Sequence, residues 1–184
     1  PQEDPFAAFG EQPTSFTGLL DTLASIEDDK TVRGVVITLN GFHPGLGHME
    51  ELNSAIASVV ESGMDVYVHC EEAMLPMSTY IMLSSASHVN AVPTSFINLS
   101  GMYMEGMYLK DALAKVGLEA DIVHIGDYKS AGETVMLNGP SIPAQEAMNW
   151  LLDGLYESSV ALLAQGRDMT PEAVRALIDA GPYT

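Results

Sequence analysis

Lys129 is the residue of this sequence whose type and setting point most directly to acid–base chemistry. It lies in the run GDYKSA (126–131), directly after the apolar residues 122–125, which predict the end of a buried strand. Only 7 of the 184 residues are Lys or Arg, so a cation is a rare choice at any position. A lysine amine in this setting could serve as the general base for a hydroxyl nucleophile.

A lysine acts as a base only if its amine is neutral near pH 7. Burial among apolar groups favours the neutral amine, because a medium of low dielectric disfavours the ammonium ion. The apolar run before Lys129 and the ring of Tyr128 fit such a site, whereas Asp127 and Glu133 would keep the amine protonated. An exposed lysine paired with one of these carboxylates is the commoner arrangement, and the spacing alone leaves it open.

The other residues that could bind a metal or act as nucleophiles form weaker patterns. His43, His48 and Glu50 fit no standard ligand spacing, so no metal is expected there. His69 and Cys70 are neighbours on a predicted strand and should point to opposite faces, which argues against a thiol with an adjacent base. No Gly-x-Ser-x-Gly motif occurs, and nothing in the sequence calls for a cofactor.

The composition describes a packed globular chain with an unusual charge. The hydrophobic fraction is 47%, and 25 acidic against 7 basic residues give a net charge of −18. This charge argues against nucleic acid or an anionic membrane surface as a direct partner, since both would repel the chain. The single cysteine excludes an internal disulfide, and no apolar run approaches the ~20 residues that span a bilayer.

The elements that would position Lys129 alternate between strand and helix. Residues 1–14 are predicted to be an irregular lead-in, and a helix begins at Ser15. The β-branched run 32–39 is typical of a strand buried on both faces. Strands alternating with helices indicate an α/β domain with a mostly parallel sheet flanked by helices. The further expected strands are 66–70, 89–92, 96–99 and 120–125, and the helices are 49–61, 73–87, 108–116, 143–165 and 171–180.

From about Ser15 to its end, the sequence resembles the signal peptide peptidase A (protease IV) family. The resemblance implies a Clp-protease/crotonase-like fold over 15–184, incomplete at both ends, and a Ser/Lys serine peptidase. It identifies Lys129 as the general base, with the GDYKSA run as its most specific part. The carriers of the resemblance are 19–37, 91–101, 108–117, 126–131 and 169–184.

The nucleophile that the resemblance calls for is absent from the expected place. Short family members have a serine in a turn of the type Ala-Ser-Gly-Gly-Tyr, and alignment on Tyr80 puts Met77 at the serine position. Ser78 is one residue away, which on a helix turns a side chain by about 100°. The loop 40–47 also departs from the family's oxyanion loop. The chain therefore resembles the base-bearing first half of the long, two-copy form, and by itself it is expected to be inactive.

The resemblance also implies partners and a location. The nucleophilic serine would come from a second half of the same protein or from a partner chain, and the substrates would be signal peptides and other short apolar peptides. A homo-oligomer on the extracytoplasmic (periplasmic) side of a membrane is expected, with its anchor outside this chain. Two alternatives remain: a catalytically silent scaffolding copy of the fold, with Lys129 a remnant, and a crotonase-type acyl-CoA enzyme.

Overall fold

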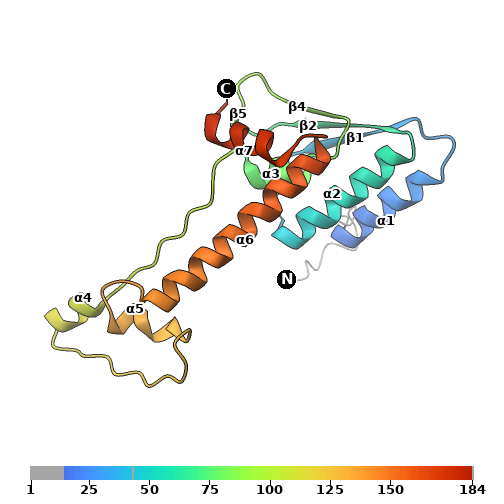
Figure 1. The fold of residues 1–184 in the computed structure, drawn as a ribbon. Helices are drawn as coiled ribbons and strands as arrows, with labels where there is room; N and C mark the ends of the chain where they lie inside the picture. Colours follow the sequence, from blue (N-terminus) through green and yellow to red (C-terminus); the bar gives the residue numbers. More distant parts are fainter. Residues whose placement is uncertain (1–14, 43, 184) are drawn as a thin grey trace. The chain divides into compact units, whose positions relative to one another are not determined.

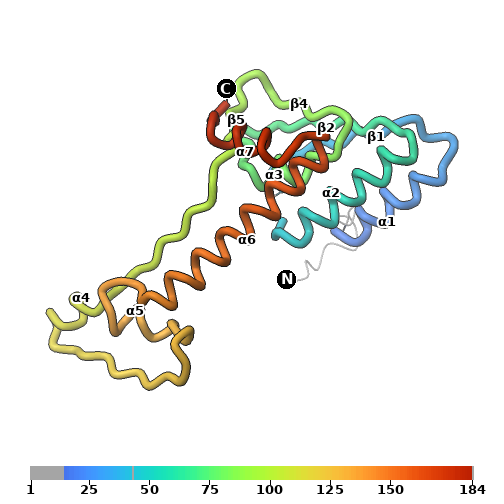
Figure 2. The backbone as a smooth tube through the Cα atoms, in the orientation of Figure 1, coloured from blue at the N-terminus to red at the C-terminus, as the bar shows by residue number. Residues whose placement is uncertain are grey.

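The structure is a computed structural model that describes residues 15–42 and 44–183 (Figures 1 and 2). These residues form two compact units. The sheet unit contains the described residues up to 100 together with 162–183, and the lysine unit contains residues 101–161. The predicted lead-in over 1–14 lies outside the described residues.

Three parallel strands form the main sheet of the sheet unit, in the order β1-β2-β4. In the register of this sheet, Val35 lies opposite Val66. The order and direction of the strands confirm the predicted α/β arrangement, because parallel neighbours need a crossover connection rather than a tight turn. The strands comprise Gly34–Leu39 (β1), Asp65–Cys70 (β2) and His88–Ala91 (β4).

Two helices, α1 (Phe16–Glu27) and α2 (Leu46–Glu61), pack on one face of this sheet (Figure 1). The Ser15 hydroxyl caps α1 by accepting a hydrogen bond from the Gly18 N–H at 3.0 Å. The chain leaves α2 through Gly63, whose φ of 93° is the left-handed conformation that glycine favours. The start of α1 agrees with the helix predicted to begin at Ser15. The core between helices and sheet includes Leu23, Leu52, Ile56, Val59, Val66, Val68 and Cys70.

The opposite face of β1 and β2 is exposed, which corrects one prediction. Val36 is 74% exposed, and burial alternates along both strands. The run 32–39 therefore forms a strand buried on one face only, not on both. The described helices leave the second face open, so the β-branched side chains on that face have nothing to pack against. Tyr67 stacks instead on His88, with ring centroids 4.5 Å apart.

A second, two-stranded parallel sheet is formed by β3 (Met74–Pro76) and β5 (Phe96–Asn98). The helix α3 (Met77–Met82) begins directly after β3. The prediction of one helix over 73–87 is therefore wrong at both ends, since α3 begins at Met77 and ends at Met82. Backbone pairing with β5, which is distant in sequence, makes the first residues of this apolar segment a strand.

The last helix of the sheet unit, α7 (Pro171–Ala180), begins as predicted. The Thr170 side chain accepts a hydrogen bond from the Ala173 N–H at 3.3 Å, and Pro171 occupies the first helical position. After α7, Tyr183 pairs antiparallel with Ile97 of β5 through two backbone hydrogen bonds of 2.8 and 2.9 Å. The tail of the chain is thereby fixed to the second sheet.

The lysine unit contains three helices and a short 3-10 turn. The backbone N–H of Leu109 donates to the Thr134 carbonyl at 2.7 Å, which joins the start of α4 to α5. α4 ends before Gly117, whose φ is 76°. The elements are α4 (Lys110–Lys115), the 3-10 turn η2 (Ser130–Gly132), α5 (Glu133–Met136) and α6 (Ile142–Gly166), of which residues 162–166 belong to the sheet unit.

The helix α6 has 25 residues, long enough in principle to cross a bilayer. Its sequence is interrupted by charged residues, among them Glu146, Asp153 and Glu157. Across residues 15–42 and 44–183, no helix combines the length and the hydropathy that a membrane span requires.

Candidate functional site

Lys129 lies in a tight turn of the lysine unit. Its backbone N–H donates to the Gly126 carbonyl at 3.2 Å, and Gly126 has a φ of 98° that glycine adopts most easily. Lys129 then precedes the 3-10 turn η2. The local sequence explains this shape, since a glycine three residues before the lysine permits the reversal.

The strand predicted before Lys129 is absent, which corrects the sequence analysis. Residues 118–125 have no regular secondary structure, and they run as an open loop between α4 and α5 (Figure 2). Val123 is 90% exposed and Ile125 is 91% exposed. These β-branched residues favour an extended chain, but no described strand pairs with them. Lys129 therefore does not follow a buried strand.

The side chain of Lys129 is exposed. In the part of the chain that the structure describes, it forms no ion pair, although the sequence offers Asp127 and Glu133 nearby. The alternative of a lysine held by one of these carboxylates is therefore not what the structure contains. The amine is free to meet another group, and the desolvation that a neutral amine needs is not provided by the described residues.

The carboxylate of Glu133 binds Ser141 instead. Its Oε2 accepts the Ser141 backbone N–H at 2.9 Å, and its Oε1 accepts the Ser141 hydroxyl at 2.6 Å. These two hydrogen bonds lower the pKa of Glu133, and the charge of His124 lowers it further against an opposing effect of burial. The sequence analysis missed this pair. The signal was Ser141 placed two residues before Pro143, a pattern typical of a helix start.

The expected nucleophile position lies at the start of α3, in the sheet unit. Met77 is the first residue of that helix, directly after β3, and it is only 7% exposed. Ser78, the next residue, is partly exposed. The helix thus begins where the alignment on Tyr80 expects a nucleophile, and a thioether fills the place of a hydroxyl.

The loop that would supply oxyanion N–H groups is occupied by carboxylates. The Gly41 N–H donates to Glu72 Oε1 at 3.0 Å, and the Asn40 amide donates to Glu71 Oε2 at 3.2 Å. An oxyanion hole needs backbone donors that are free to receive a developing negative charge. The Gly41 N–H is already used, so this part of the loop is unsuited to that task.

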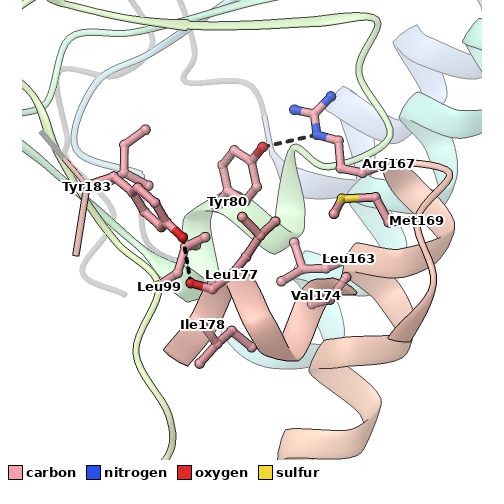
Figure 3. Close-up of a pocket in the computed structure, with 10 residues that line it drawn as sticks. Tyr80, Leu99, Leu163, Arg167, Met169, Val174, Leu177, Ile178 and Tyr183 are labelled. Carbon is pink, nitrogen blue, oxygen red and sulfur yellow. Dashed lines mark hydrogen bonds between the residues drawn. The ribbon is translucent and has the colours of Figure 1, made fainter. Parts of the chain in front are cut away.

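An apolar cavity of about 320 Å³ lies in the sheet unit, among α3, β5, the end of α6 and α7 (Figure 3). Arg167 at its rim donates from Nε to the Tyr80 hydroxyl at 3.2 Å and from Nη1 to the Ala86 carbonyl at 3.0 Å. Its guanidinium also lies 5.2 Å from the centre of the Tyr80 ring. Arg167 thus serves a structural role, and the described lining offers no acid–base pair.

The weaker candidates from the sequence bind nothing in the described structure. His43 lies outside the described residues, and the ring of His48 packs against Phe16 with centroids 4.4 Å apart. Within the described ranges no cluster of three potential metal ligands occurs. His69 is exposed and Cys70 is buried on the other face of β2, as predicted. Burial, followed by the charge of Glu72, raises the pKa of the Cys70 thiol.

Comparison with known proteins identifies the family. The sequence profile of Peptidase family S49 matches residues 59–184, which include α3, the Lys129 turn and α7. The chain belongs to peptidase family S49. The parallel strands flanked by helices agree with the Clp-protease-like fold of S49 peptidases, so the predicted fold class and family are confirmed.

Several curated relatives of this S49 chain are peptidases by name. It is 24% identical over 155 residues to the chloroplastic serine protease SPPA of Arabidopsis thaliana, covering 84% of the chain and 23% of that relative. It is 24% identical over 173 residues to Protease 4 of Salmonella typhi, covering 91% and 28%. It is also 23% identical over 178 residues to the "Putative signal peptide peptidase SppA" of Enterococcus faecium, covering 95% and 50%.

The S49 chain spans between 23% and 50% of the length of these relatives. Its two candidate positions fall in different units, since Lys129 belongs to the lysine unit and Met77 to the sheet unit. Both positions lie inside the matched region. The assignment of Lys129 as the base of an S49 peptidase remains a prediction.

Proposed function

We propose that this chain is the base-bearing part of a Ser/Lys serine endopeptidase that degrades signal peptides and other short apolar peptides. Lys129 would accept the proton of a serine hydroxyl as it attacks a peptide carbonyl, and it would then return the proton to the leaving amine. The S49 membership and the names of the curated relatives support a peptidase.

One observation supports the role of Lys129: among the described residues its exposed amine forms no ion pair, in a chain with a net charge of −18. A carboxylate beside the amine would stabilise its charged form, and no described carboxylate pairs with Lys129. An amine without one can approach a hydroxyl. For it to lose its proton, the partner must also bury it among apolar groups. The exposed Tyr128 and Ile125 beside it would become part of that apolar wall.

The serine is proposed to lie outside this chain, in a second half of the same protein or in a partner chain. Two features of the sheet unit support this: the buried Met77 at the start of α3, and the Gly41 N–H that is already bound to Glu72. The share of the relatives that the chain covers leaves room for such a half.

We also propose that the whole protein is a homo-oligomer associated with the extracytoplasmic side of a membrane. The location is supported by the sequence similarity to relatives named protease 4 and signal peptide peptidase. The exposed apolar side chains of the lysine unit support assembly, because a surface this apolar is more stable when covered. They include Tyr103, Met107, Val116, Val123, Ile125, Ile142 and Trp150.

A catalytically silent scaffolding copy of the fold is the second candidate. It is favoured by the exposure of Lys129 and by the missing strand before it, since nothing among the described residues desolvates the amine. The two candidates differ in one respect that can be measured: only the first requires the lysine amine for activity.

The test replaces Lys129 with Met in the full-length protein. We expect hydrolysis of an internally quenched apolar peptide to fall to background, since general bases contribute about 10²–10⁴-fold. Thermal unfolding should be nearly unchanged, because an exposed, unpaired side chain contributes little stability. Full activity in Lys129→Met would exclude the base assignment and favour the scaffolding role.

The matched control is Ser78→Ala. If the nucleophile lies outside this chain, removal of the Ser78 hydroxyl should leave kcat and KM unchanged. Loss of activity in this variant would mean that Ser78, not Met77, occupies the nucleophile position and that the chain holds its own dyad.

A further inference from the structure

The Glu133–Ser141 pair joins the Lys129 turn to the start of α6. Ser141 is the N-cap of α6: its hydroxyl accepts the Ala144 N–H at 3.3 Å, and its carbonyl accepts the Gln145 N–H at 2.9 Å. Glu133 is buried, with 9% of its surface exposed, and both of its carboxylate oxygens bind Ser141. A carboxylate at this helix end is favoured by the partial positive charge there.

A second contact holds the other side of the turn. The hydroxyl of Tyr128 donates to Glu146 Oε2 on α6 at 3.1 Å. Glu146 lies in the second turn of α6, a few residues after Ser141. Lys129 therefore stands between two attachments to one rigid helix: Tyr128 immediately before it and Glu133 four residues after it.

Between these two attachments the backbone is short and is held by hydrogen bonds within the turn. The Lys129 N–H bonds the Gly126 carbonyl at 3.2 Å, and the Glu133 N–H bonds the Ser130 carbonyl in η2. The chain before the turn forms neither helix nor strand over residues 118–125, and its contact with the turn includes His124 Nδ1, which lies 3.2 Å from the Gly126 carbonyl. The contacts of Tyr128 and Glu133 are those that tie the turn to α6, a regular element of the unit.

We propose that Glu133 is a positioning residue: through Ser141 it anchors the Lys129 turn to the N-terminus of α6, and the Tyr128–Glu146 hydrogen bond supports it from the other side. This inference rests on the proposed role of Lys129 as the base. Glu133 touches neither substrate nor nucleophile. Its effect is geometric, since a displacement of about 1 Å in a reacting group can cost on the order of 10²-fold in rate.

The main test compares Glu133→Ala, Glu133→Gln and Lys129→Met in the full-length protein, with an internally quenched apolar peptide as substrate. We expect Glu133→Ala to lower kcat by about 10- to 100-fold with KM changed less than about threefold, as for a misplaced catalytic group. Glu133→Gln should recover most of kcat, because its amide oxygen can accept the Ser141 N–H and its amide nitrogen can donate to the Ser141 hydroxyl.

Two further variants make the test specific. Ser141→Ala keeps the backbone N–H but removes the hydroxyl, so its kcat should fall between the wild type and Glu133→Ala. Glu119→Ala, an exposed glutamate of the same unit, is the matched control and should have wild-type kcat. If Glu133→Ala fails to fold, Ser141→Ala and Glu133→Gln test the proposal instead. A lowered kcat in Ser141→Ala together with a near-normal kcat in Glu133→Gln supports it.

Hydrogen exchange gives a readout that does not depend on activity. Amides 127–132 should exchange faster in Glu133→Ala and at the wild-type rate in Glu133→Gln. Wild-type kcat in Glu133→Ala, with Lys129→Met inactive, would overturn the positioning role and leave the base assignment intact. Activity in Lys129→Met would overturn the proposed function instead. Unchanged exchange at 127–132 in Glu133→Ala would overturn the anchoring itself.

Discussion

Glu133 should make the stability of the lysine unit depend on pH. Its pKa is lowered because the hydroxyl and the backbone N–H of Ser141 both donate to the charged form, and because the positive charge of His124 favours it. A carboxyl group with a lowered folded-state pKa stabilises the fold above its unfolded pKa of about 4.3. This stabilisation is lost as the pH falls through the lowered, folded-state value.

The variant Glu133→Gln tests this dependence, since glutamine does not titrate. Between about pH 6 and pH 3, the free energy of unfolding should fall more steeply in the wild type than in Glu133→Gln. Denaturant titrations at several pH values measure the two slopes. Glu119→Gln, which changes an exposed glutamate outside the Ser141 pair, should keep the wild-type slope. Equal slopes in the wild type and Glu133→Gln would contradict the shift.

For single residues, the sequence showed which side chains are the candidates for chemistry, but it did not show what surrounds those side chains in the fold. Lys129 and Met77 stand out from their local motifs, and the structure puts Met77 at a helix start, as the alignment requires. The environment of Lys129 was not predicted. Burial and ion pairing depend on chain segments that spacing cannot locate. Among the described residues, neither the predicted strand before Lys129 nor the alternative carboxylate partner occurs.

At the scale of elements, the end of α6 packs unusually close to the segment after α3. A Cβ atom built on Gly166 would lie 2.7 Å from the backbone carbonyl carbon of Ser84, closer than real Cβ atoms approach. Ser84 is fully buried, and its hydroxyl donates to the Ile81 carbonyl at 2.8 Å. Neither backbone can move without disturbing this contact, so glycine is required at position 166.

Alanine substitutions at two glycines of the same helix should therefore have opposite effects. Gly166→Ala should lower the free energy of unfolding by about 1–3 kcal/mol through overpacking. Gly154→Ala should raise it by about 0.5–1 kcal/mol, because a Cβ there meets nothing within 4 Å and alanine favours the helix. Urea denaturation of the two variants measures both values. A stabilised Gly166→Ala would show that the contact with Ser84 is looser than described.

The elements that were predicted correctly are those whose signals are local. The helices α1 and α7 begin within one residue of their predicted starts, where the Ser15 and Thr170 side chains cap them. The error at the start of the segment 73–87 and the error at 120–125 have one cause. A strand exists only where another strand pairs with it: β3 finds β5, whereas 120–125 finds none among the described residues.

At the scale of the whole molecule, the isolated 184-residue chain is expected not to hydrolyse peptide esters. No serine starts α3, and the described residues do not desolvate Lys129. The measurement is the release of alcohol from an apolar peptide ester, with the full-length protein as the active control. Turnover by the isolated chain that Lys129→Met abolishes would contradict the proposal that the nucleophile lies outside it.

The sequence by itself determined the family, the α/β class, the starts of α1 and α7 and the identity of the proposed base. These properties depend on residue types at fixed short spacings along the sequence, which do not depend on how distant segments pack. Only the tertiary structure decided that Val36 faces solvent, that residues 118–125 form a loop, and that Glu133 binds Ser141 and leaves Lys129 unpaired. Each of these depends on which distant segment lies alongside, and burial and pairing arise from that proximity rather than from local pattern.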